Sequence, residues 1–146
     1  MLLGLGGKDT LNGGLSDAPL KGGAGNGTFV VGNLGDGVNE GAGGGGGDVV
    51  QTSLACYLLG NNVENLTYTG SSFTGTYNPL TNTNTNTITG RAGNDSLAAL
   101  DGDDIFVLGA GFSADLVFGF DAASAGGQDR MDISAMSIRQ RPLPPI

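Results

Sequence analysis

Large apolar residues recur every nine positions in two blocks of the chain. The recurring residues are Leu11, Leu20, Phe29 and Val38 in the first block and Ile88, Leu97 and Phe106 in the second. The residues between them are mainly Gly, Asn, Asp and Thr. Gly, Asn and Asp supply the positive φ angles that tight turns require, and the short apolar stretches leave room only for short strands. The pattern therefore predicts short strands that alternate with tight turns and bury one apolar side chain each.

The clearest units are two consecutive nonapeptides, residues 90–98 and 99–107, of the form G-G-x-G-x-D-x-U-x, where U is a large apolar residue. One such unit forms a turn and a strand, which is half a coil. Two units close one coil of a flattened solenoid, so that residues i and i+18 stack about 4.7–4.9 Å apart on neighbouring coils. The predicted fold class is all-β, a parallel β-roll or right-handed β-solenoid.

The nonapeptide resembles the RTX (repeats-in-toxin), or hemolysin-type, calcium-binding repeat of bacterial type I secreted proteins. The match covers residues 1–40 and 81–136 and is strongest at 86–108. The resemblance implies Ca²⁺ as the cofactor, because Ca²⁺ prefers oxygen ligands such as turn carboxylates and carbonyls. The candidate ligands are turn residues of the repeats: Asp9, Asp36, Asn86, Gly93, Asp95, Asp101, Gly102, Asp103 and Asp104.

The 18-residue spacing also predicts which residues of neighbouring turns stack on one another. The expected pairs are Asp9 with Gly27, Ala18 with Asp36, Asn86 with Asp104, and Asp95 with a position near Ser113. No two aspartates at the sixth repeat position are expected to face each other. Because the apolar position is kept in seven of seven repeats and the aspartate in only four, we expect few and weak calcium sites that depend on backbone carbonyls. Lys8 beside Asp9 favours binding at the second block over the first.

Breaks in the periodicity divide the chain into five segments. Residues 1–40 are the first β-roll block, and 41–80 are a Gly-rich excursion followed by spacer strands. Residues 81–108 form the second block, and the apolar segment 109–138 is expected to cap the last coil, as any solenoid requires. The tail, 139–146, is basic and rich in proline, and it departs from the C-terminal signal of type I secretion substrates.

Composition and charge exclude several classes of function. The formal net charge is −8, which argues against a nucleic-acid partner and suits a cation-binding protein. No apolar run reaches the roughly 18 residues that a membrane-spanning helix needs. Histidine is absent and Cys56 is the only cysteine, so zinc sites and His-dependent catalysis lose their usual residues. Cys56 is expected to be a small buried apolar residue.

Together with these observations, the resemblance implies a secreted, calcium-binding β-roll module that serves the folding and secretion, or the surface structure, of an extracellular bacterial protein. The resemblance implies the type I secretion machinery as a partner, and no catalytic activity is assigned. One alternative is a structural protein whose solenoid ends stack into homo-oligomeric layers or filaments. The other is a glycan-active β-helix enzyme that uses carboxylates such as Asp103 and Asp104.

Overall fold

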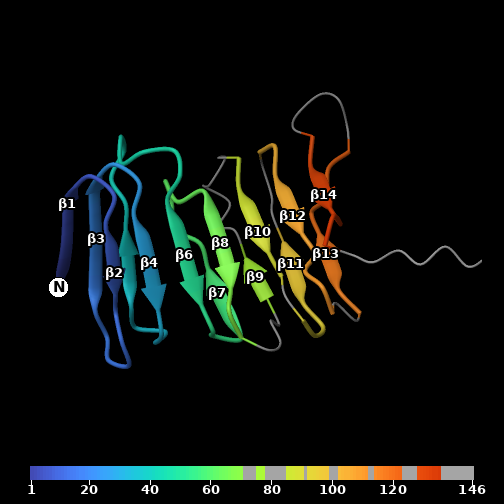
Figure 1. Ribbon diagram of the computed structural model, residues 1–146, viewed down its shortest axis with the longest axis horizontal. Helices are drawn as coiled ribbons and strands as arrows, with labels where there is room; N and C mark the ends of the chain where they lie inside the picture. Colours follow the sequence, from blue (N-terminus) through green and yellow to red (C-terminus); the bar gives the residue numbers. More distant parts are fainter. Residues whose placement is uncertain are drawn as a thin grey trace, which may run out of the picture.

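The computed structural model describes residues 1–70, 75–77, 85–90, 92–98, 102–111, 114–122 and 128–135. Within these residues the chain forms fourteen short strands and no helix. The strands lie side by side along the long axis of the molecule, from β1 at one end to β13 and β14 at the other (Figure 1). They are β1 (Leu2–Gly6), β2 (Thr10–Asn12), β3 (Pro19–Ala24), β4 (Thr28–Val31), β5 (Gly37–Asn39), β6 (Val49–Thr52), β7 (Cys56–Leu58), β8 (Asn65–Tyr68), β9 (Gly75–Tyr77), β10 (Thr87–Thr89), β11 (Ser96–Ala98), β12 (Ile105–Val107), β13 (Leu116–Phe118) and β14 (Arg130–Asp132).

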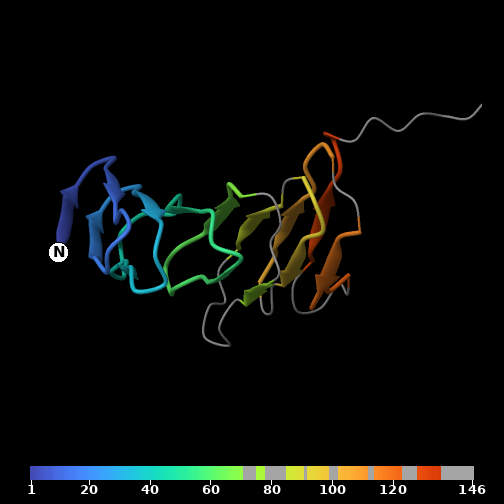
Figure 2. The same cartoon turned by 90° about the horizontal axis from the view of Figure 1, so that it is seen from below.

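Successive strands alternate between two faces of a flattened coil (Figure 2). The even-numbered strands of the described residues form one continuous seven-stranded sheet, in the order β14-β12-β10-β8-β6-β4-β2. The odd-numbered strands form the opposite face as three smaller sheets, β1-β3-β5, β7-β9 and β11-β13. All the strand pairs are parallel. The predicted all-β parallel solenoid is confirmed.

The register between coils follows the repeat where the repeat is present. Thr10 pairs with Thr28 and Ile88 with Phe106, both 18 residues apart as predicted. Between the two blocks the spacing changes, because the connecting turns differ in length. Phe29 pairs with Val50, and Val50 pairs with Leu66, so residues 41–80 contribute β6 and β8 to the same continuous sheet.

The core lies between the two faces, and each face contributes a line of inward-pointing side chains. Six of the seven recurring apolar residues are buried, and Phe29, Leu97 and Phe106 have no exposed surface. Val38 is half-buried and packs against this core. The connecting segment adds the buried side chains of Val50 and Leu66 to the line of the seven-stranded sheet. Each coil therefore buries about one large apolar side chain per strand, and its stability depends on the neighbouring coils.

The first nonapeptide differs from its predicted structure at the N-terminus. Gly4, Leu5 and Gly6 were expected to begin a tight turn, but they belong to β1, which pairs with β3 from Leu2 to Gly6. Leu5 has a positive φ of 72° and is 75% exposed, so the strand is distorted at this residue. The turn begins only at Gly7, whose φ is 111°.

The described part of segment 109–138 extends the solenoid by two strands. β13 adds a strand beside β11, and β14 adds one beside β12. Leu116, Phe118 and Met131 are 57%, 54% and 46% exposed, respectively. The apolar side chains of this segment are therefore partly exposed on the last described strands, and the capping role stays a prediction.

Two further predictions from the sequence concern the burial of Cys56 and membrane-spanning segments. Cys56, which was expected to be buried, is exposed, because it occupies an outward-facing position at the start of β7. No helix among the described residues is long and apolar enough to cross a membrane.

Candidate calcium-binding turns

The turns at one edge of the solenoid place one residue of each coil in a single column. Each of these residues immediately precedes a strand of the seven-stranded sheet, so the parallel register of the strands also aligns the residues before them. In order along the solenoid they are Asp9, Gly27, Asp48, Glu64, Asn86, Asp104 and Asp129. We refer to these seven residues as the acidic column.

Hydrogen bonds along the acidic column run from a backbone N–H to the side chain one coil later. Gly27 N–H donates to Asp48 Oδ1 at 2.6 Å, and Asp48 N–H donates to Glu64 Oε2 at 2.9 Å. Asn86 N–H donates to Asp104 Oδ1 at 2.8 Å, and Asp104 N–H donates to Asp129 Oδ1 at 3.0 Å. Each carboxylate therefore satisfies a turn N–H of the preceding coil that no strand ladder can reach.

The opposite edge of the solenoid repeats this arrangement in two places. Ala18 N–H donates to Asp36 Oδ1 at 3.0 Å, and Asp95 N–H donates to Asp115 Oδ1 at 2.9 Å. The expected stacking of Asp95 near Ser113 is wrong, because Leu97 pairs with Val117, 20 residues later. The longer turn before β13 places Asp115 at this position. Two aspartates therefore do face each other across neighbouring coils.

Several of these carboxylates are buried with one oxygen unused. Asp104 has no exposed surface, and its Oδ2 atom has no hydrogen-bond partner. Asp115 Oδ2 is likewise buried without a partner. Burial raises the pKa of Asp104 to about 6, and the charges of Asp129 and Asp103 add to this rise. A buried carboxylate oxygen without a donor, close to like charges, fits the ligand set of a hard cation.

The remaining predicted ligands take different positions. Gly93 and Gly102 have φ angles of 113° and 137°, which only glycine adopts readily, and so shape the turns before Asp95 and Asp104. Asp103 is exposed and accepts a 3.1 Å hydrogen bond from Gln128 N–H. Asp101 lies outside the described residues.

The two predicted ligands of the first block have distinct environments. Asp9 is half-buried, and its carboxylate lies beside Gly4, where a side chain would contact it. Asp36 is buried, and both of its oxygens are used: Oδ1 by Ala18 N–H, and Oδ2 by the N–H groups of Gly32 and Asn33 at 3.0 and 3.1 Å. Asp36 therefore already has a structural role in this turn.

The described residues contain no cluster of three or more acidic or cysteine side chains arranged around one metal position. That calcium sites here depend on backbone carbonyls stays a prediction. Glu40, Asp48 and Glu64 are not among the predicted ligands, because Asp48 and Glu64 lie between the two repeat blocks and Glu40 is the last residue of the first block. The sequence does mark Asp48 and Glu64 as candidates, because each immediately precedes a short stretch that contains apolar residues.

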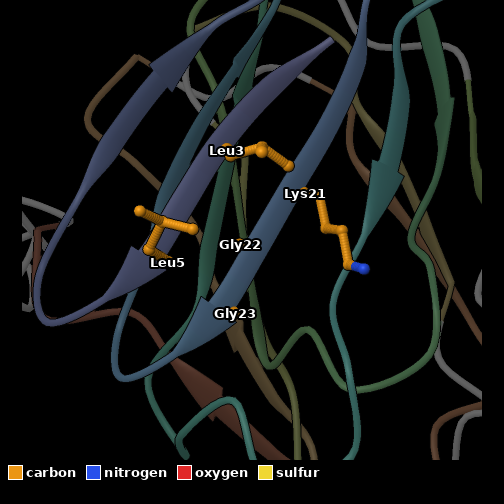
Figure 3. A pocket seen from close by; sticks show the side chains of 5 residues that line it. All are labelled: Leu3, Leu5, Lys21, Gly22 and Gly23. Atoms are coloured by element: carbon orange, nitrogen blue, oxygen red, sulfur yellow. The ribbon is translucent and has the colours of Figure 1, made fainter.

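A shallow depression lies on the outer face of the first coils. It has a volume of about 260 Å³ and is lined by Leu3, Leu5, Lys21, Gly22 and Gly23 (Figure 3). None of these described residues is acidic, so the depression adds nothing to a cation site.

A parallel solenoid with stacked carboxylates at its turns is a β-roll. Within it, residues 80–113 match the family model of the RTX calcium-binding nonapeptide repeat, in its four-copy form. We refer to this matching segment, which contains β10, β11 and β12, as the RTX segment. Neither a curated protein nor a solved structure matches the chain significantly.

Proposed function

We propose that this chain is a calcium-binding β-roll module of a secreted bacterial protein, and that Ca²⁺ drives the completion of its fold outside the cell. The observation that carries this proposal is Asp104, a fully buried carboxylate in the RTX segment whose Oδ2 atom has no partner. The like charges of Asp103 and Asp129 raise its pKa further. A cation at this edge would remove that repulsion.

The proposed ligands belong mainly to the second block. Asn86 and Asp104 would contribute on one edge, with Asp101, Gly102 and Asp103 in the same turn. Asp95 and Gly93 would contribute on the other edge, and Asp115 extends that site. Asp9 and Asp36 are weaker candidates, because Asp9 has no acidic partner one coil later and Asp36 already accepts three backbone hydrogen bonds.

The dependence of folding on Ca²⁺ follows from the chemistry of the turns. Without a cation, each buried carboxylate carries a desolvation cost and is repelled by its neighbours, so the folded state is weakened. Extracellular modules function with Kd near 10⁻⁴–10⁻³ M, an affinity that weak sites provide. A chain that stays incompletely folded at low cytosolic Ca²⁺ would suit export by type I secretion machinery. We assign no catalytic activity to it.

Calcium titration of the full chain tests this proposal. We expect circular dichroism to show increasing β structure, and the melting temperature to rise, between about 0.1 and 10 mM Ca²⁺. Mg²⁺ at equal concentration is the control, because it requires stricter octahedral geometry and should have a smaller effect. Identical spectra and melting temperatures with Ca²⁺ and with a chelator would contradict the proposal.

Assembly through the solenoid ends is a second candidate function, and the exposed last coil favours it. Met131 continues the buried line beyond Phe106 but is 46% exposed, and β14 has an unpaired edge within the described residues. A second copy could pair its β2 with this edge in the same parallel register.

Light scattering should then show association that Met131→Lys abolishes and Leu58→Lys does not. Leu58 is 53% exposed but lies away from both ends. A monomer at all concentrations would contradict this candidate.

A further inference from the structure

Three carboxylates outside the RTX segment lie together at the edge that carries the acidic column. Glu40 follows β5, Asp48 precedes β6, and Glu64 precedes β8, so they belong to two successive turns of the same edge (Figure 1). The charges of Asp48 and Glu64 both act on Glu40 and raise its pKa, after the larger effect of burial. Burial, and then the charge of Asp48, raises the pKa of Glu64.

Glu40 is held in a cradle formed by backbone. Its Oε1 atom accepts hydrogen bonds from Gly23 N–H at 3.1 Å and Gly41 N–H at 3.2 Å. Its Oε2 atom is buried and has no partner, and the side chain is only 6% exposed. Any Cβ atom at Gly22 or Gly44 would collide with this carboxylate, so the space is available only because both positions are glycine.

Asp48 brings a second unused oxygen to the same region. It has no exposed surface; its Oδ1 atom accepts from Gly27 N–H, while Oδ2 has no partner. A side chain at Gly22 would meet both Glu40 and the tip of the Phe29 ring, and one at Gly27 would meet the same ring tip and Asp48. Both carboxylates therefore lie near the tip of the same ring. Glu64 is joined to Asp48 directly, because its Oε2 atom accepts from Asp48 N–H.

The arrangement leaves negative charge uncompensated in a buried place. Two buried carboxylate oxygens without donors, with a third carboxylate beside them, destabilise the fold unless a cation or protons neutralise them. We propose that Glu40, Asp48 and Glu64 hold a hard divalent cation of the Ca²⁺ class at a site separate from the nonapeptide turns. The all-oxygen donor set selects this class over zinc or copper.

Backbone groups complete the ligand set of this site. The three carboxylates do not by themselves form a complete metal-binding cluster in the structure. Glu40 Oε2 and Asp48 Oδ2 are the direct ligands, and main-chain carbonyls of the Gly-rich turn between them supply further oxygens. Glu64 holds the Asp48 turn in place and balances the charge of the ion. The connection between β5 and β6 thus has a chemical role beyond joining the two repeat blocks.

Calorimetric titration of the full chain with CaCl₂ tests the site. We expect the double variant Glu40→Gln/Asp48→Asn to bind one ion fewer per chain than the unmodified protein. Asp17→Asn, which removes an exposed acid, is the matched control and should leave the number of ions unchanged. An unchanged stoichiometry in the double variant would overturn the proposal.

Two further variants test the site if the double variant does not fold, and distinguish it from the RTX turns. If the double variant does not fold, Glu40→Gln alone decides, because its amide oxygen still accepts from Gly23 and Gly41. We expect several-fold more Ca²⁺ to be needed for half of the thermal stabilisation, and an unchanged midpoint would overturn the proposal. Asp95→Asn/Asp104→Asn separates this site from the RTX turns. One retained ion supports the site, whereas loss of all binding overturns it and leaves the calcium function of the RTX segment standing.

Discussion

The backbone N–H of Asp104 donates a 3.0 Å hydrogen bond to the carboxylate of Asp129, although 25 residues separate them. Asp104 belongs to the last nonapeptide, whereas Asp129 lies beyond the RTX segment. The acidic column therefore continues past the repeats, through a turn of different length and sequence. Along this edge the fold aligns the residue that precedes each strand, whatever the sequence of the turn. The nonapeptide is one turn sequence that places an acidic residue there.

This arrangement joins the scaffold to the cation chemistry. A carboxylate in the column satisfies a backbone N–H of the preceding coil, which favours folding. The same carboxylate is buried beside other acids, which opposes folding until the charge is neutralised. Gly27 and Asn86 interrupt the column with uncharged residues and lower this repulsion at two of its seven positions. We infer that the balance between the two effects sets the calcium dependence of the fold.

Phe106 is predicted to be the most important single side chain of the second block. It is completely buried, pairs in register with Ile88 and Met131, and its ring lies 6.1 Å from that of Phe120. Phe106→Ala should lower the free energy of unfolding by about 3–5 kcal/mol in saturating Ca²⁺. Chemical denaturation measures this loss, and Leu116→Ala, at a 57% exposed position, is the control with a small effect. Equal losses for the two variants would show that the core is assigned incorrectly.

Asp36 should act as a structural residue and not mainly as a calcium ligand. Its two oxygens accept hydrogen bonds from three backbone N–H groups, and Asp36→Ala leaves all three without this partner. We expect a loss of about 2–3 kcal/mol in the free energy of unfolding. The loss should be the same in chelator as in Ca²⁺, which thermal denaturation in both buffers would establish. A loss that appears only in Ca²⁺ would instead identify Asp36 as a ligand.

Much of the fold could be predicted, because the information is local. A nine-residue repeat with one apolar position specifies the strand, the turn and the inward side chain together, and Leu20, Phe29 and Leu97 are buried accordingly. The stacking of Asn86 on Asp104 followed from the same repeat and is confirmed by their 2.8 Å hydrogen bond.

The rest depended on turn lengths, which the periodicity does not encode outside the repeats. Asp48 enters the acidic column because β4 and β6 pair 21 residues apart, and Asp115 faces Asp95 because β11 and β13 pair 20 residues apart. Glu40 could not be identified from the sequence, because its role depends on Gly22, which comes close to it only in the folded chain. The exposure of Cys56 likewise depends on where β7 begins, because the first residue of this strand points outward.

The stability of the calcium-free chain should increase on mild acidification. Burial raises the pKa values of Asp104, Glu40 and Glu64, so the folded chain binds protons more tightly than the unfolded chain. Protonation therefore stabilises the folded state, and in chelator the melting temperature should rise as the pH falls from about 7 to about 5. In Ca²⁺ the trend should reverse, because protons compete with the ion for the same oxygens. Calorimetry at several pH values measures both trends, and a melting temperature in chelator that falls on acidification would contradict the prediction.

Asp104 should carry more of the calcium binding than Asp9. Asp104 is fully buried with an unpartnered Oδ2 atom and has Asp103 and Asp129 close by. Asp9 is half-buried, is aligned with Gly27 one coil later and follows Lys8 in the sequence, so its site has less negative charge. Asp104→Asn should lower the number of bound ions measured by calorimetry, while Asp9→Asn leaves it nearly unchanged. The amide retains an oxygen that can accept the Asn86 N–H, so a loss of ions in Asp104→Asn reports on charge and coordination more than on the turn. Loss of an ion in Asp9→Asn but not in Asp104→Asn would show that the ranking by buried carboxylates is wrong.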